Sequence, residues 1–190
     1  MALSLIGLGF CVLMLITGLD YAKQISTMAR IKQHLNVALH AGSLSVDEVR
    51  LSQGKLRLDV TTPGFRVQDQ FYKYLRENMI LDNSNRAGPG SYLSVGSKVE
   101  VHSLLYADPE TGLLSILHGS GSNCTVSAGK LKCDMVLHAG SGDETFRPLD
   151  ELLVGPSLIS LVEVEHQGLG WLGEEPIVIA GVQEVRFHWN

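Results

Sequence analysis

Cys124 and Cys133 are the two side chains whose spacing most clearly predicts a chemical bond. The residues between them are typical of a β-hairpin centred on Ala128 and Gly129. Pairing the two strands about that centre places Cys124 opposite Cys133 at a non-hydrogen-bonded position, where side chains across an antiparallel ladder come closest. The spacing therefore predicts a disulfide, a bond that persists in oxidising compartments.

The turn of this hairpin has two possible forms. A two-residue turn of the type preferred in hairpins needs a positive φ at its first position, and Ala128 is a poor residue there. A four-residue loop with the same cysteine pairing is the alternative. The third cysteine, Cys11, lies far away in an apolar N-terminal segment.

Two short patterns resemble catalytic or cofactor motifs, but their surroundings do not fit. Residues 168–173 match the dinucleotide-binding pattern G-x-G-x-x-G. In that motif the third glycine opens a helix, whereas residues 174–176 are Glu-Glu-Pro, so a glycine-rich turn is the better interpretation. Ser52 with Lys55, and Ser127 with Lys130, have the serine–lysine spacing of acylases. Both pairs straddle predicted turns, and we interpret them as chance matches.

No histidine pair has the spacing of metal ligands among the seven histidines of the chain. The acidic pairs at residues 143–144 and 150–151 are interpreted as charged loop residues beside Arg147. The sequence therefore predicts a protein that is not an enzyme, with no catalytic, cofactor-binding or metal-ligating residue and no cofactor.

The composition limits the class of protein. Hydrophobic residues make up 45% of the 190 residues and charged residues 18%, which is enough to bury one core and argues against a disordered chain. The net charge of −5 repels phosphate backbones, and no run of Lys or Arg offsets it. We therefore expect no nucleic-acid partner.

The first nineteen residues contain no side chain that is charged at neutral pH. As a helix this stretch would be about 28 Å long, close to the thickness of the hydrocarbon core of a membrane. A cleaved signal peptide is the alternative, but it needs a basic segment at the start and a small-x-small cleavage site, and neither precedes Asp20. We therefore predict an uncleaved anchor in membrane lipid.

The helical pattern continues past the anchor as an amphipathic helix to about His40, and Gly42 is a plausible end signal. We therefore divide the chain into a transmembrane and amphipathic helix, residues 1–42, and a β-rich domain, residues 43–190. The apolar residues expected to face lipid or a filament core are Leu3, Leu5, Ile6, Leu8, Phe10, Val12, Leu13, Leu15, Ile16, Leu19, Ile25, Leu35 and Leu39.

The rest of the chain predicts short strands and one further helix. Alternating apolar residues favour a hairpin over residues 49–60, and Thr62 followed by Pro63 favours a helix that ends near Asn78. Val67, Phe71 and Leu75 are spaced by four, so this helix should bury one stripe. A loop is expected at residues 82–90, and strands at residues 99–106, 113–118, 124–126, 131–138, 158–166 and 176–189. The predicted fold class is α+β, a long N-terminal helix followed by an antiparallel β-rich domain.

Two features of the sequence predict opposite orientations in the membrane. Lys23, Arg30 and Lys32 follow the anchor, and the positive-inside rule would leave the β-rich domain in the cytoplasm. The predicted disulfide between Cys124 and Cys133 favours the opposite side. We give the disulfide more weight and expect a single-pass membrane protein with its C-terminal domain outside the cytoplasm.

An apolar span that passes directly into an amphipathic helix and a C-terminal antiparallel domain resembles type IV pilin-like subunits, including the TadE-like minor pilins. The resemblance lies in Leu3 to Leu39, with residues 54–59 and 71–82 adding to it. It implies a structural subunit or assembly component of a cell-surface filament, which associates with itself or with other pilin-like subunits. The chain departs from the family at Leu5, since family members usually carry a glutamate near the start of the apolar helix.

A second hypothesis keeps the anchor and changes the role of the domain. A membrane-tethered extracytoplasmic domain could present a β-rich surface to a protein or ligand partner. Trp171 and Trp189 would favour this hypothesis if they were exposed on that surface, because aromatic residues often anchor interfaces.

Overall fold

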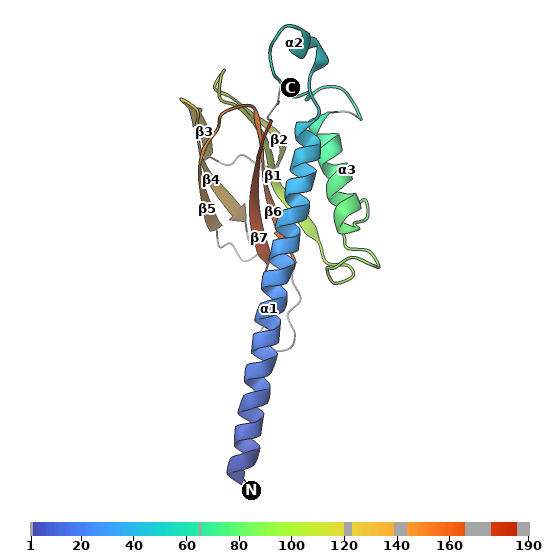
Figure 1. The fold of residues 1–190 in the computed structure, drawn as a ribbon, viewed down its shortest axis with the longest axis vertical. Helices are drawn as coiled ribbons and strands as arrows, with labels where there is room; N and C mark the ends of the chain where they lie inside the picture. Colours follow the sequence, from blue (N-terminus) through green and yellow to red (C-terminus); the bar gives the residue numbers. More distant parts are fainter. Residues whose placement is uncertain (1, 65, 120–122, 139–143, 166–175, 186–190) are drawn as a thin grey trace, which may run out of the picture.

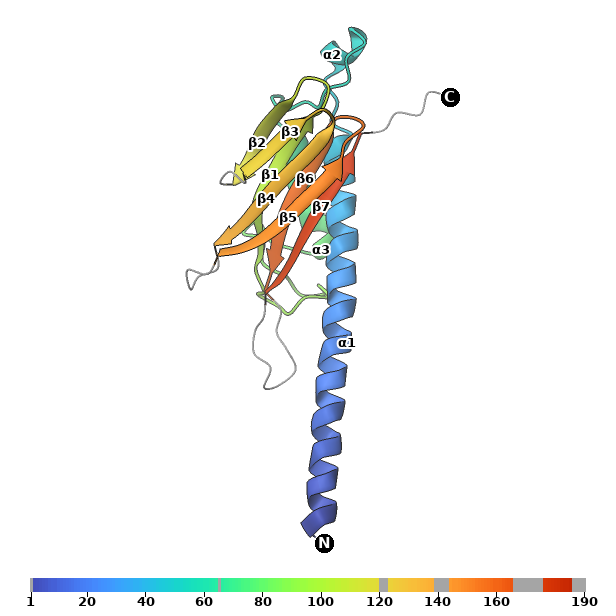
Figure 2. The same ribbon diagram turned by 90° about the vertical axis from the view of Figure 1, so that its left-hand side faces the viewer.

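The computed structural model describes residues 2–64, 66–119, 123–138, 144–165 and 176–185. One long helix, α1 (Ala2–Ser43), packs with α3 (Val67–Met79) on one face of an antiparallel sheet, and a second sheet covers the other face. Figures 1 and 2 show the helices, the first sheet and the second sheet as successive layers, with the N-terminal part of α1 extending away from them. The α+β fold class predicted from the sequence is confirmed.

The two sheets are both antiparallel. The first has the strand order β2-β1-β6-β7, and the second has the order β3-β4-β5. The bounds of the strands are β1 (Val99–Asp108), β2 (Leu113–Gly119), β3 (Asn123–Ser127), β4 (Lys130–His138), β5 (Glu144–Leu152), β6 (Ser157–Val164) and β7 (Ile177–Glu184). Six of these strands lie at or near positions predicted from the sequence. The exception is β5, where the sequence predicted no strand.

The layers enclose two apolar cores. The first lies between the helices and the four-stranded sheet and contains Leu39, Phe71 and Leu158. The second lies between the two sheets and contains Leu131 and Ile159. Strand β6 is apolar or small along most of its length because it contributes side chains to both cores, as expected for a strand covered on both faces.

α1 consists of two unlike halves. Every residue from 7 to 19 is exposed, whereas Ile31, Leu35, Ala38 and Leu39 are fully buried against the rest of the protein. The buried residues recur at three- and four-residue steps, so one stripe of the second half faces the sheet and α3. The second half of α1 therefore belongs to the same core as the strands, and a boundary at residue 42 does not separate two cores.

The hairpin predicted over residues 49–60 is wrong. Residues 48–52 form a short helix, α2 (Glu48–Ser52), and the strand-like pairing described there is a single bridge between Val46 and Leu58. The side chain of Asp47 accepts a hydrogen bond from the backbone N–H of Arg50 at 3.1 Å. This N-cap stabilises a helical turn where the alternating pattern favoured a strand.

The helix predicted to follow Thr62 and Pro63 starts later than expected. The Asp59 carboxylate accepts hydrogen bonds from the backbone N–H groups of Thr61 at 2.8 Å and Thr62 at 2.9 Å, which holds these residues in a turn. α3 begins only at Val67 and ends at Met79, close to the predicted end. Its buried stripe includes Val67, Phe71 and Leu75, as the sequence predicted.

Residues 144–152 form β5, so the interpretation of residues 144, 150 and 151 as loop residues is wrong, while residue 143 lies outside the described ranges. β5 pairs with β4 from end to end and is an edge strand of its sheet. An edge strand tolerates Pro148 and exposed charges such as Asp150 and Glu151, because one side of its backbone needs no partner. Because of these residues, the segment lacks the alternating apolar pattern that predicts a strand.

Candidate functional site

The first half of α1 is an apolar surface without a cover in the described structure. The exposed fractions of Leu8, Phe10, Leu13 and Leu15 lie between 57% and 64%, and the other residues predicted to face lipid in this half are exposed too: Val12, Ile16 and Leu19. Leu3, Leu5 and Ile6 also lie in α1, but their side chains are outside the described set. In Figures 1 and 2 this part of α1 extends well beyond the sheets.

Of the remaining helix residues predicted to face lipid or a filament core, one is exposed and two are buried. Ile25 is 52% exposed and lies on an outward face, whereas Leu35 and Leu39 are fully buried in the core of the globular part. Within the described residues, α1 from Gly7 to Ser43 is the helix that is long and apolar enough to cross a membrane. The residues available to lipid or to other helices thus lie in the first half and on the outer face of α1.

Three glycines interrupt the apolar surface of this first half. A Cβ placed on Gly7, Gly9 or Gly18 would meet no other atom within 4 Å. The fold of a single chain therefore does not require glycine at these positions. Small residues in membrane helices allow a neighbouring helix to approach closely.

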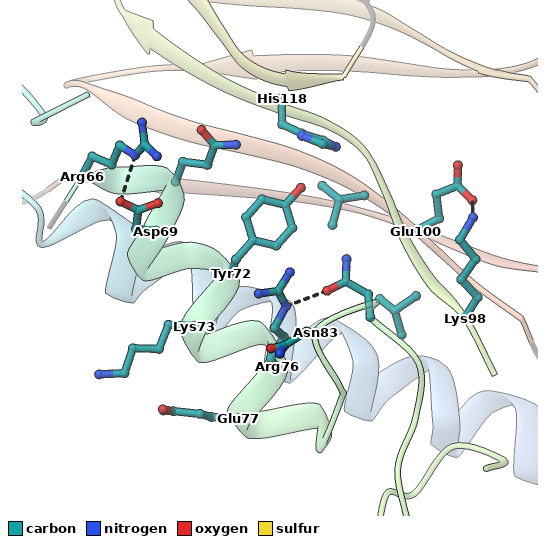
Figure 3. A pocket seen from close by; sticks show the side chains of 14 residues that line it. Arg66, Asp69, Tyr72, Lys73, Arg76, Glu77, Asn83, Lys98, Glu100 and His118 are labelled. Atoms are coloured by element: carbon teal, nitrogen blue, oxygen red, sulfur yellow. Dashed lines mark hydrogen bonds and ion pairs between the residues drawn. The ribbon is translucent and has the colours of Figure 1, made fainter. Parts of the chain in front are cut away.

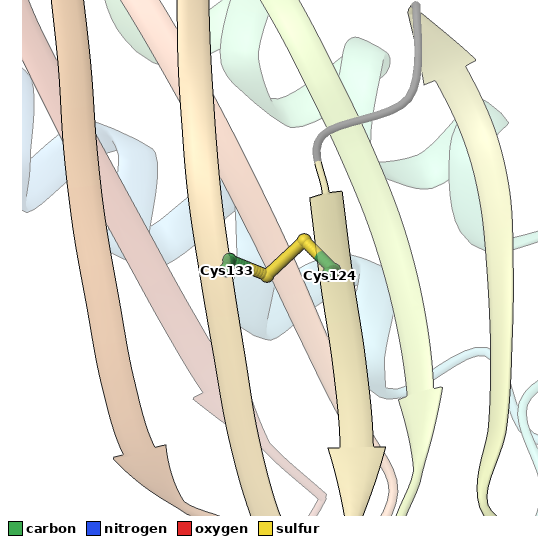
Figure 4. Close-up of a disulfide and its surroundings, with 2 residues drawn as sticks. All are labelled: Cys124 and Cys133. Carbon is green, nitrogen blue, oxygen red and sulfur yellow. A yellow bond between two sulfur atoms is a disulfide. The ribbon is translucent and has the colours of Figure 1, made fainter.

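Cys124 and Cys133 form a disulfide across strands β3 and β4 (Figure 4). They are direct partners in the ladder, with Cα atoms 4.0 Å apart, as the sequence predicted. Ala128 and Gly129 both have positive φ, so the turn is the two-residue form and not the four-residue loop. Cys133 is buried between the sheets, and Cys11 is an exposed free thiol on α1.

A cleft of about 790 Å³ lies between α3 and the strands β1 and β2 (Figure 3). Residues of α3, of the loop that follows it and of both strands line this cleft. Figure 3 shows Tyr72 of α3 pointing towards His118 of β2. The two rings meet edge to face with their centroids 5.5 Å apart, so the cleft has one aromatic wall.

Arg76 lies beside this wall and is held in place by two contacts. Its Nε donates a hydrogen bond to the Asn85 side-chain oxygen at 2.8 Å, and its guanidinium carbon lies 5.3 Å from the centre of the Tyr72 ring. Burial raises the pKa of Tyr72 to about 12, with Arg76 opposing the shift, so the phenol stays protonated at neutral pH. The Tyr72 hydroxyl is therefore available as a hydrogen-bond donor.

The charges that line the cleft are arranged in pairs. Arg66 binds Asp69 at 2.8 Å, and Lys98 binds Glu100 at 2.5 Å. These contacts lower the pKa of Asp69 and of Glu100: at Asp69 they outweigh the opposing effect of burial, and at Glu100 the hydrogen bond from Lys98 is the main cause. Both carboxylates are therefore engaged with neighbouring cations.

Sequence reasoning did not identify this cleft. Residues 66, 69, 73 and 76 recur at the three- and four-residue steps that mark one face of a helix, and the polar face of α3 was the available signal. That signal is also typical of an ordinary solvated helix face. The contribution of His118 depends on the packing of β2 beside α3, which no local pattern predicts.

Among the described residues, the histidines do not gather at one place. His34 stacks on Tyr92, and His102 contacts Glu163 at 2.6 Å across strands β1 and β6. In the part of the chain that the structure describes, no group of three His, Cys, Asp or Glu side chains is placed to hold a metal ion. The glycine-rich residues 168–173, which include Trp171, lie outside the described residues, and so do His166, His188, Phe187 and Trp189.

The chain was compared with models of protein families, with curated proteins and with solved structures, and none of them matches it.

Proposed function

We propose that this protein is a pilin-like structural subunit or assembly component of a cell-surface filament, held in the membrane by α1 before assembly. The observation that carries the proposal is the contrast within one continuous helix. Residues 7–19 are exposed and apolar on all sides, while Ile31, Leu35 and Leu39 anchor the same helix in the globular core. Such a helix fixes an apolar rod rigidly to a water-soluble domain.

The apolar rod needs a non-aqueous environment. Removing apolar surface from water contributes about 25 cal/mol for each Å² that is buried, and soluble monomers rarely expose large contiguous apolar patches. Lipid provides this environment for a single chain. The rod can leave lipid only where other helices replace it, and a filament core built from like helices does so.

Continuity of the helix supports an anchor over a cleaved signal peptide. α1 runs from Ala2 to Ser43 as one element, and residues 20, 27 and 31 are already buried. A cleavage between the apolar segment and the domain would have to act within this helix, close to its buried stripe. The sequence also lacks the small-x-small cleavage site of a signal peptide before Asp20, which agrees with an uncleaved anchor.

The contacts of the basic residues support a domain outside the cytoplasm. Lys32 donates a hydrogen bond to the Ala180 carbonyl on β7, and Arg30 lies 5.9 Å from the centre of the Tyr92 ring. Burial lowers the pKa of Lys32, and Glu151 opposes that shift. Because Arg30 and Lys32 have roles inside the domain, their presence after the anchor is weaker support for a cytoplasmic domain.

The test changes the glycines of the rod and leaves its apolar character intact. The full chain with Gly7, Gly9 and Gly18 all replaced by Leu should remain in the membrane, because leucine favours both helix and lipid. We expect its assembly into high-order species in mild detergent or in lipid vesicles to be reduced at least about tenfold, since large side chains keep helices apart. Size measurement and electron microscopy read out assembly.

A matched control keeps side-chain volume constant. Replacing Leu8, Leu13 and Leu15 by Ile changes shape without adding bulk between helices, and this variant should assemble nearly as well as the natural chain. If the natural chain is strictly monomeric in detergent and in vesicles, the filament proposal is wrong. An anchored monomer would then be the remaining interpretation.

A membrane-tethered binding domain is the second candidate function, and the cleft between α3 and β2 favours it. Its volume of about 790 Å³ lies within the range of small-molecule sites, and Arg76 and Tyr72 present polar and aromatic groups to it. A protein that binds a ligand in this cleft while remaining monomeric in lipid would favour this candidate over the filament subunit.

A further inference from the structure

We propose that the cleft between α3 and strands β1 and β2 binds a carboxylate that is attached to a planar or apolar group, with Arg76 holding the carboxylate and the Tyr72–His118 wall contacting the attached group. This inference is independent of assembly, because none of these three residues lies on α1. The ligand could be a small aromatic acid or the C-terminal residue of a peptide, since both carry the same chemistry.

The geometry of Arg76 is suited to an anion. Its Nε is used by Asn85, and among the described residues no group accepts a hydrogen bond from its two terminal nitrogen atoms. These atoms form a planar fork that matches the two oxygens of a carboxylate. The cation–π contact with Tyr72 and the hydrogen bond to Asn85 hold the guanidinium in position, which lowers the entropic cost of binding.

The position of Asn85 is itself fixed by the backbone. Asn85 lies in the left-handed region with φ of 58°, a conformation that asparagine tolerates better than most residues. Its N–H donates to the Asp82 carbonyl at 3.0 Å, and its own carbonyl accepts from Val99 N–H at 2.9 Å. The partner of Arg76 is therefore bound to the start of β1, which couples the two sides of the cleft.

The local charge favours an acid despite the negative charge of the whole protein. Four cationic side chains and three carboxylates line the cleft, so it carries a charge of about +1 in a chain of net charge −5. Asp69 and Glu100 are engaged with Arg66 and Lys98. Apart from these two pairs, the charged residues that line the cleft are the cations Arg76 and Lys73 and the acid Glu77.

The wall beside Arg76 favours a flat or apolar group next to the carboxylate. Tyr72 is half-buried and contacts both the guanidinium and His118. Aromatic rings pack well edge to face or offset, and each such contact adds to the apolar area removed from water. A carboxylate without an attached group would use only the Arg76 end of the site.

The experiment compares a charged ligand with its neutral counterpart on the full chain in lipid nanodiscs. N-acetylphenylalanine carries the carboxylate and the ring, and N-acetylphenylalaninamide carries the ring alone. We expect the acid to bind at least about tenfold more tightly than the amide, as measured by NMR titration, because only the acid can form charge-assisted hydrogen bonds with the Arg76 guanidinium. Equal binding of the two compounds would overturn the proposal.

Two variants locate the site. Arg76→Gln should weaken binding of the acid at least about tenfold and leave binding of the amide unchanged, whereas Arg50→Gln, the same change of charge on α2, should alter neither. Arg76→Lys keeps the charge but not the fork, and we expect an intermediate affinity. An equal loss in Arg50→Gln and Arg76→Gln would show that only general charge matters and would contradict the proposal.

A last comparison separates the two sources of the ligand. The peptide acetyl-Gly-Ser-Gly-Phe with a free C-terminus is compared with N-acetylphenylalanine. Tighter binding of the peptide assigns the cleft to the end of a protein chain, and equal binding assigns it to a small acid. A peptide that binds equally well with an amidated C-terminus would overturn the role of the carboxylate.

Discussion

Gly181 of β7 lies directly against Leu39 of α1, so closely that a Cβ on residue 181 would be 2.6 Å from Leu39 Cδ1. The same Cβ would lie 3.1 Å from Leu35 Cδ2. Both leucines are fully buried and have little room to move. The absence of a side chain at residue 181 therefore sets how closely the helix packs on the sheet.

Gly181→Ala should destabilise the fold by about 1–3 kcal/mol, because a methyl group must displace two buried leucines. Thermal unfolding followed by circular dichroism in detergent measures the change. Gly88→Ala is the matched control, since a Cβ there would lie at an ordinary 3.4 Å from the Ile80 carbonyl oxygen, and it should change stability by less than about 0.5 kcal/mol. Equal melting temperatures for the natural chain and Gly181→Ala would contradict this account of the packing.

Mass spectrometry of unreduced peptides should recover Cys124 joined to Cys133, with Cys11 as a free thiol. Replacing both paired cysteines by Ser should cost less than the roughly 3 kcal/mol expected for a 15-residue loop, because the loop closed here is shorter. We expect a locally weakened hairpin, seen as faster hydrogen exchange in β3 and β4, and a folded domain. Two free thiols at residues 124 and 133 in protein from its native compartment would remove the main support for a domain outside the cytoplasm.

The side of the membrane can be tested with a new thiol at an exposed position. Ser84 is exposed in the loop after α3, and Ser84→Cys in a Cys11→Ala background places one free thiol on the domain. A membrane-impermeant maleimide should label this variant in intact cells, because we expect the domain to lie outside the cytoplasm. Labelling that appears only after lysis would reverse the orientation.

Acid should remove a defined part of the stability through Asp59. Burial opposes ionisation of this carboxyl, but hydrogen bonds from Thr62 and Thr61 outweigh it and lower the pKa of Asp59 to about 2. Because the pKa is about 3.9 in an unfolded chain, the ionised carboxylate contributes fully above about pH 4, and its contribution is lost as the pH falls towards 2. Asp59→Asn should therefore melt at a lower temperature than the natural chain at pH 5, and the difference should shrink at pH 2.5.

One outcome would contradict the prediction for Asp59. A difference in melting temperature that stays the same between pH 5 and pH 2.5 would mean that the charge of Asp59 does not stabilise the turn before α3. The hydrogen bonds to Thr61 and Thr62 would then act equally well with a neutral acceptor.

The sequence alone determined the features that depend on neighbouring residues. The lack of charged side chains up to Leu19 predicts an apolar helix without knowledge of any other element. The short spacing around Ala128 and Gly129 sets the register of the hairpin, and the register sets the cysteine pairing. The stripe of α3 follows from its helical period for the same local reason.

The tertiary structure decided what depends on contacts between distant segments. Burial of Leu35 and Leu39 requires the close approach of Gly181, which lies on the last described strand. β5 lies at the edge of its sheet, and this position explains why a polar segment that contains a proline can form a strand. The cleft forms because the packing of α3 against the sheet places His118 beside Tyr72. That packing depends on the whole apolar core, so no local sequence pattern predicts it.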